Sequence, residues 1–209
     1  ASAAIAGSKI SPTFTTDGSF NSVSIGKGAN SVSSNTVLGV NALDASVTGA
    51  NNTAIGENSL TDLTSGAANV CIGNSTGKEL TTGSNNTAVG VSSLFTQTTA
   101  SNNTAFGRST LKFNTSGTEN VAVGGFALDA NTTASNNTAV GYNSLGATTT
   151  GSENTGVGSS ALVNNTTGNN CTAIGRSSMV ENTSGASNTA VGADSLKNNT
   201  TASNNTAVG

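Results

Sequence analysis

Residues 192–209 read GADSLKNNTTASNNTAVG, and variants of this segment follow one another from residue 40 onward. A glycine returns every 17 residues without insertion or deletion, at Gly39, Gly56, Gly73, Gly90, Gly107, Gly124, Gly141, Gly158, Gly175, Gly192 and Gly209. A strict repeat of this length predicts a solenoid, in which each repeat forms one coil that packs against its two neighbours. We number positions within the coil from this glycine, which is coil position 0.

The composition indicates a thin coil that needs a partner. Only 8% of the 209 residues are charged, the net charge is −3 and aromatic residues make up 3%. Few apolar residues in strict register predict a narrow column of core side chains, and association is a common way to stabilise such a poor core. The seven Lys and Arg residues are scattered and form no basic patch, so we expect no nucleic-acid partner.

Two columns of apolar residues recur in the repeat and are predicted to form the core. Coil position 4 is Leu or Met in every regular coil except at Gly77. Coil position 16 is always apolar, from Ile55 to Val208. The segment Asn-Thr-Ala-Val reads as a short strand, and two-residue alternation places positions 14 and 16 on one face. We expect that face to point inward.

Coil position 15 lies between these two columns and is occupied by very small residues. If positions 14 and 16 point inward, position 15 points outward, and its constant small size predicts that another backbone packs against it. We interpret this column as the seam of a homotrimer; the alternative is that it reflects the low-charge composition alone. The predicted seam residues are Ala54, Cys71, Ala88, Ala105, Ala122, Ala139, Gly156, Ala173, Ala190 and Ala207.

Charged and amide side chains are confined to particular columns. In the regular repeats, charges occur only at coil positions 1, 2, 5, 6 and 12, which predicts that these positions face water. Asn occupies position 13 in nine of ten coils, with Cys171 as the exception, and a stacked Asn column can form a hydrogen-bonded ladder. Gly at position 0 and Gly or Ala at position 10 are predicted to mark the bends.

The chain divides into three segments. Residues 1–20 do not follow the repeat and contain the single proline, so we interpret them as a linker, and residues 21–39 as a degenerate lead-in coil. Residues 40–209 form ten regular coils. Cys71 and Cys171 lie about six coils, roughly 28 Å, apart at about 4.8 Å per coil, which excludes a disulfide bond between them.

The repeat resembles two groups of known proteins. The hexapeptides NSVSIG at 21–26 and NNTAVG or NNTAIG thereafter are similar to the head repeats of YadA-like trimeric adhesins. The longer unit NNTAVGxxSLxxNTTG, and the opening ASAAIAGSKISPTFTTDGSF, resemble tail fibres of bacteriophages and marine viruses. This resemblance implies an all-β fold, a left-handed parallel β-roll (a β-solenoid), in which three chains pack around one axis.

Catalytic chemistry is not expected from this sequence. The chain has no His and no Trp, so Ser-His-Asp, Cys-His and His-based metal sites are impossible. Asp62 with Glu57 or with Glu79 could form a carboxylate pair, but we interpret these residues as scattered solvated charges. We predict that the protein is not an enzyme and binds no cofactor or metal. It has no apolar run of 18 residues, so membrane insertion is not expected.

Four aromatic residues occupy columns that are predicted to face water. Phe95, Phe113, Phe126 and Tyr142 are therefore candidate ligand-binding residues, because exposed rings can stack on sugars or on another protein. The alternative is that they pack on neighbouring chains or cover local gaps.

These observations predict the structural shaft of a trimeric virion tail fibre or spike that presents a host-receptor-binding tip. Its partners would be copies of itself, other tail or fibre proteins and a glycan-bearing receptor on the host cell surface; its location would be the virion. The alternative is a bacterial trimeric surface adhesin that binds host matrix or glycans. A distant alternative is an ice-binding solenoid, but the Thr columns at coil positions 8 and 9 are adjacent and do not alternate.

Overall fold

The structure is a β-solenoid, seen in a computed structural model that describes residues 18–20 and 23–209. The predicted linker is thus described only at residues 18–20. No helix occurs in these ranges. The thirteen strands are β1 (Gly18–Phe20), β2 (Val23–Gly26), β3 (Thr36–Gly39), β4 (Thr53–Ile55), β5 (Val70–Ile72), β6 (Thr87–Val89), β7 (Thr104–Phe106), β8 (Val121–Val123), β9 (Thr138–Val140), β10 (Thr155–Val157), β11 (Thr172–Ile174), β12 (Thr189–Val191) and β13 (Thr206–Val208).

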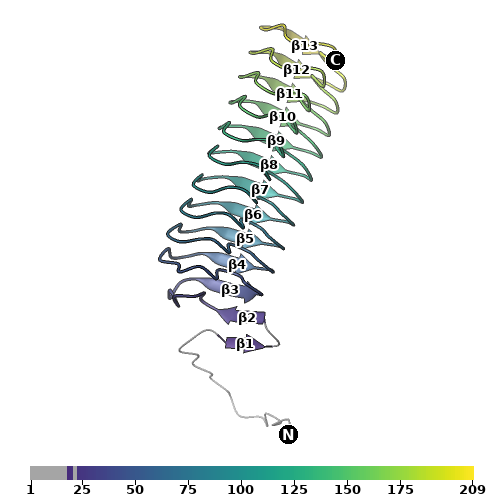
Figure 1. Cartoon of the computed structure of the whole chain (residues 1–209). Helices are drawn as coiled ribbons and strands as arrows, with labels where there is room; N and C mark the ends of the chain where they lie inside the picture. The colour runs from purple at the N-terminus through teal and green to yellow at the C-terminus, as the bar shows by residue number, and fades with distance from the viewer. Residues whose placement is uncertain (1–17, 21–22) are drawn as a thin grey trace.

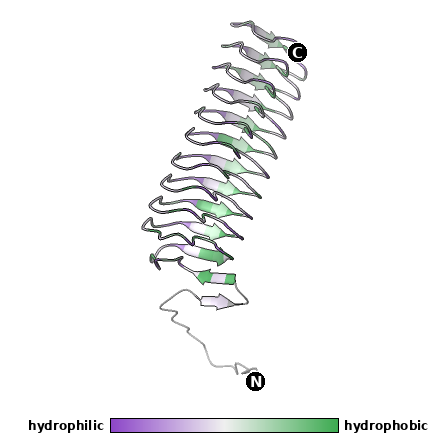
Figure 2. Ribbon diagram, in the orientation of Figure 1, coloured by the Kyte–Doolittle hydropathy of each residue, from purple (hydrophilic) through white to green (hydrophobic). Residues whose placement is uncertain are grey.

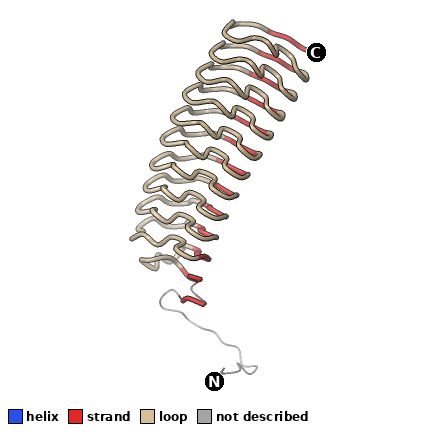
Figure 3. Tube along the Cα trace, turned by 45° about the vertical axis from the view of Figure 1, so that its right-hand side comes forward, coloured by secondary structure: helices blue, strands red, loops and turns tan. Residues whose placement is uncertain are grey.

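All thirteen strands form one sheet in chain order, and β3 to β13 are parallel. Figure 1 shows the coils stacked as a rod, and Figure 3 shows the strands in one column along it. Each coil pairs with the next in register; for example, Thr138 lies opposite Thr155. The predicted solenoid of ten 17-residue coils is confirmed, because strands β4 to β13 recur at that spacing.

The start of the rod differs from the rest. Strand β1 pairs antiparallel with β2, and β2 pairs antiparallel with β3. Residues 23–39 therefore do not form the lead-in coil predicted for 21–39, because Gly39 follows Gly26 at a spacing of only 13 residues, too short for a 17-residue turn, and β3 runs antiparallel to β2. Strand β2 covers the β3 edge, which would otherwise be a free site for pairing with another strand.

The leucine column at coil position 4 is the centre of the core, as predicted. Its members from Leu43 to Met179 have no exposed surface. They also adopt left-handed backbone angles, for example φ of 49° at Leu111 and 52° at Leu145. Such a conformation costs a non-glycine residue about 1–2 kcal/mol, so burial of the leucine side chain has to offset it in every coil.

The strands face the opposite way from the sequence prediction. Coil position 15 points inward: Ala54, Cys71, Ala88, Ala105, Ala122, Ala139, Ala173 and Ala190 are fully buried within the single chain, Gly156 is buried, and Ala207 is half-buried in the last coil. The predicted seam at these residues is therefore wrong. The coil is thin, and opposite a leucine only a methyl-sized side chain fits, so the larger residues at positions 14 and 16 face outward. They are exposed or half-buried and do not belong to the core.

Two ladders of buried amides run beside the leucine column. At coil position 13, Asn69 Nδ2 donates to Asn52 Oδ1 at 3.1 Å and to the Gly83 carbonyl at 2.9 Å. The Asn69 backbone N–H also donates to Asn52 Oδ1 at 3.0 Å. This pattern recurs along the rod, which confirms the predicted Asn ladder.

The second ladder, at coil position 7, was not predicted. It contains Gln97, Asn114, Asn131, Asn165, Asn182 and Asn199. Thr148 interrupts it, because its side chain is too short to continue the chain of hydrogen bonds. As a result, Asn131 Oδ1 and Thr148 Oγ1 are buried without a hydrogen-bond partner.

Cys71 in the second regular coil and Gly77 in the third compensate for each other. Gly77 replaces the usual leucine, with φ of 58°, and a Cβ added there would lie 2.8 Å from Cys71 Sγ and 3.1 Å from Leu60 Cδ2. The Cys71 sulfur therefore fills space that the leucine of other coils would enter. Burial raises the pKa of the Cys71 thiol to about 12. Cys71 and Cys171 are both free and buried, as the sequence predicted.

We expect Cys71→Ala and Gly77→Leu each to destabilise the fold when made alone. The first leaves a small cavity and the second forces a side chain against the sulfur, each costing about 1–3 kcal/mol. The double variant restores the residues typical of other coils, and it should recover at least about 1 kcal/mol relative to the sum of the single effects. Urea unfolding of the four proteins measures this coupling; strictly additive effects would contradict the compensation.

Candidate interaction surfaces

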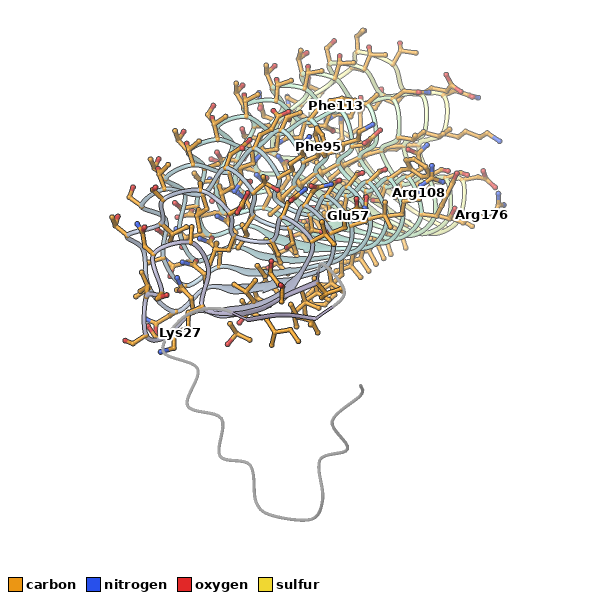
Figure 4. The ribbon with its side chains drawn as sticks, turned by 60° about the horizontal axis from the view of Figure 1, so that its bottom comes forward. Lys27, Glu57, Phe95, Arg108, Phe113 and Arg176 are labelled. Atoms are coloured by element: carbon orange, nitrogen blue, oxygen red, sulfur yellow. The ribbon has the colours of Figure 1, made fainter. Side chains whose placement is uncertain are left out.

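The outward face of the parallel sheet carries a row of apolar side chains that runs along all the regular coils. We define the sheet face as the side chains at coil positions 14 and 16 of β4 to β13. Position 14 is Thr, or Val in β5 and β8; position 16 is Val, Ile or Phe. Figure 4 shows a row of side chains projecting from the outer side of the sheet, at the bottom of the view.

Large apolar side chains on the sheet face remain accessible in the single chain. Exposed fractions are 42% for Phe106, 41% for Ile174 and 38% for Val123, and 79% for Val208 in the last coil. No charged residue occurs at coil positions 13 to 16 in the regular coils. Figure 2 shows the hydrophobic colour concentrated along the strands, while the loops are mostly hydrophilic. Contiguous apolar patches of this extent usually mark an interaction site.

Charged side chains lie on the other surfaces of the coil, as predicted from their columns. Glu57, Arg108 and Arg176 at coil position 1 follow one another along one side of the rod (Figure 4). Within residues 18–20 and 23–209, the ion pairs are Arg176 with Asp194 at 2.9 Å and Lys197 with Asp194 at 3.3 Å. Both are solvent-exposed, so they contribute little to stability.

The four aromatic candidate residues do not form one site. Phe95 and Phe113 project from coil positions 5 and 6, away from the Arg108 column (Figure 4). Phe126 and Tyr142, at positions 2 and 1, contact each other edge to face with ring centroids 5.8 Å apart. The two pairs lie in different columns of the coil, and their predicted role in ligand binding stays a prediction.

Three of these four rings already have a cation from the same chain beside them. Lys78 lies 5.5 Å from the ring centre of Phe95, Lys112 lies 4.6 Å from that of Phe113, and Arg108 lies 5.2 Å from that of Phe126. Such contacts contribute about 0.5–1 kcal/mol at exposed sites. The rings thus serve in part to hold long cationic side chains against the coil, and Tyr142, 59% exposed, is the most accessible of the four.

The described residues offer little support for chemistry at a single centre. Within the described ranges no group of three Cys, Asp or Glu residues could hold a metal ion. Burial raises the pKa of the half-buried Asp129 carboxyl, although the nearby Lys112 opposes the shift.

No family model matches the chain, and no curated protein or solved structure matches it either. The described part of the chain also contains no helix long and apolar enough to cross a membrane. The sheet face therefore carries the functional argument by its own geometry.

Sequence reasoning did not assign Phe106 to any surface. It was placed in the predicted core column at coil position 16, whereas the structure exposes it on the sheet face. The signal that could have found it is the neighbouring Asn column. Buried Asn at position 13 and buried Ala at position 15 share a phase, so position 16 must point outward.

Proposed function

We propose that this chain is the shaft of a trimeric virion tail fibre or spike, a rigid spacer for a receptor-binding tip formed by other residues. The observation that carries the proposal is the sheet face, which is free of charge, exposes an unbroken row of apolar side chains at coil position 16 and is as long as the array of regular coils. Its length and regularity suit a permanent interface, and the charged side chains of the regular coils all lie on the other surfaces.

A second copy of the chain is the partner that fits this face best. The sheet face repeats once per coil, about every 4.8 Å, and only a surface with the same spacing can match it coil for coil. Three sheet faces turned toward one axis would bury all of these side chains. In this arrangement the charged columns stay in water, where tail proteins and a host glycan receptor could be reached.

Charge placed on the sheet face should separate the three chains. We expect the unmodified protein to sediment as a trimer of about 61 kDa, three times 20.2 kDa. Val123→Glu would bring three carboxylates together in an apolar seam, and the desolvation cost should weaken assembly at least about a hundredfold. Analytical ultracentrifugation should then show monomers.

The matched control is Val163→Glu, which introduces the same charge at the water-facing coil position 5 and should remain trimeric. A monomeric unmodified protein at tens of micromolar would refute the trimeric shaft. Detection of the protein in purified virions would favour a tail fibre over the alternative, a trimeric adhesin on a bacterial surface.

Ice binding is the second candidate, and the strand orientation favours it more than the sequence did. The sheet face alternates outward Thr at coil position 14 with outward Val or Ile at position 16 in regular rows, for example Thr138 with Val140 and Thr189 with Val191. This use requires the face to stay open in a monomer. Thermal hysteresis of a monomeric protein at millimolar concentration would support it; a trimer without hysteresis would exclude it.

A further inference from the structure

The near-identity of the coils creates a problem of register for any assembly through the sheet face. Two copies that slide past each other by one coil still place Val, Ile and Thr against Val, Ile and Thr, and lose the contacts of only one coil. Repetitive surfaces of this kind specify register weakly unless something breaks the repeat. For three chains to assemble level with one another, the sheet face therefore needs a residue that breaks the repeat.

Phe106 is the side chain that breaks the repeat most strongly. It is the one aromatic residue at coil positions 14 and 16 of β4 to β13, and its neighbours in the column are Val89 and Val123. The diagonal neighbour on β8 is Val121, 37% exposed, where most coils have Thr. The segment β7 to β8 is therefore the bulkiest and most apolar part of the face, and it lies near the middle of the array.

The chain itself does not use the outer surface of this ring. Phe95, Phe113 and Phe126 each lie beside a cation of the same chain. In the described residues no cation or other ring covers Phe106, which is 42% exposed on the strand. An uncovered aromatic near the centre of an apolar face is typical of a side chain that contributes most of the energy of an interface.

We infer that Phe106 sets the axial register of the trimer, an inference that rests on the proposed function. When the three chains are level, three Phe106 rings meet at one height and pack on one another. A slip of one coil sets each ring against a valine of another chain. It then overpacks one level and leaves a gap at the next, and both defects are unfavourable.

Cross-linking of mixed trimers tests the register directly. Two variants carry a single new thiol on the face, Thr155→Cys or Thr172→Cys, with Cys71→Ala, Gly77→Leu and Cys171→Asn in both, since other coils have these residues together. The variants are refolded together and oxidised, and linked peptides are identified by mass spectrometry. Links between equal positions report level chains, and links between positions 155 and 172 report a slip of one coil.

We expect equal-position links to dominate when Phe106 is present. Phe106→Val should raise the ratio of slipped to level links about tenfold, although the chain still folds, since Val occupies this column in other coils. Phe113→Val removes a ring that is not on the face, and it should leave the ratio unchanged. A chain with the ring moved by one coil, Phe106→Val with Val123→Phe, should link to an unmodified-face chain mainly through position 172 of the former and position 155 of the latter.

The trimeric shaft and the role of Phe106 can be refuted separately. If the unmodified protein is monomeric and gives no links, the proposed shaft is wrong. If it is a level trimer and Phe106→Val keeps the same ratio of links, or the moved ring does not shift the register, then Phe106 does not set the register and the trimer stands without it.

Discussion

Replacing Gly141 by alanine is expected to lower the free energy of unfolding by about 3 kcal/mol or more. Gly141 has φ of 132°, and a Cβ added there would lie 2.6 Å from both the carbonyl carbon and oxygen of Gly158 in the next coil. The clash is with backbone, which cannot move aside without breaking the register of the strands. The strain adds to the cost of a side chain at this φ.

Urea unfolding followed by far-ultraviolet circular dichroism measures this loss. The matched control is Gly125→Ala in the preceding coil, where the added Cβ would meet nothing closer than 3.7 Å, at Tyr142 Cδ2. We expect the control to change stability by less than about 0.5 kcal/mol. Equal losses of stability in the two variants would show that the predicted clash with the Gly158 backbone does not decide the cost at Gly141.

Asn120→Ala should be the second large loss, about 3–5 kcal/mol. Asn120 Nδ2 donates to Asn103 Oδ1 at 3.1 Å and to the Ala134 carbonyl at 2.9 Å. Its Oδ1 accepts from the Asn137 backbone N–H at 3.0 Å. Removing the amide loses three buried hydrogen bonds and leaves the Asn137 backbone N–H without a partner, which costs more than that bond itself contributes.

Two further variants define this prediction. Asn164→Ala removes an exposed amide that lies outside both ladders and should change stability by less than about 0.5 kcal/mol. Thr148→Asn should do the opposite of Asn120→Ala, because the new amide can donate to the unpartnered Asn131 Oδ1 and stabilise the rod by about 1 kcal/mol. If Asn120→Ala costs no more than Asn164→Ala, the ladder does not hold the coils together.

The repeat determined most of the fold at the level of sequence. The period of the glycines predicted the coil length, the leucine column predicted the core, and the confinement of charge predicted which columns meet water. Each of these predictions depended on a residue type with a narrow preference: glycine for positive φ, leucine for burial and charged side chains for water. The antiparallel pairing of β2 with β3 was missed because Asn21–Gly26 carries the repeat motif, although too few residues follow that motif to complete a coil.

The facing of the strands was the error that mattered for function. Alternation shows that Thr138 and Val140 share a face, but it does not tell which face is inside. Size suggested that valine belongs in the core, yet the coil is so narrow that Leu128 and its column fill it, and only Ala139 fits beneath. Because the strands face the other way, coil positions 14 and 16 form the candidate interaction surface, and Phe106 belongs to that surface and not to the core.

The antiparallel strands β1 and β2, which precede β3, have a consequence for how the rod is built. Every later strand pairs with the one 17 residues before it, so contacts span about 0.08 of the 209-residue chain, a relative contact order typical of fast-folding helical bundles. Slow folding of parallel sheets comes from closing long loops, and here each loop is one coil. Strand β3 is paired with β2 on one edge, and its other edge is the template on which β4 pairs. Each following coil can dock as soon as it leaves the ribosome. The order of synthesis is therefore also the order of assembly.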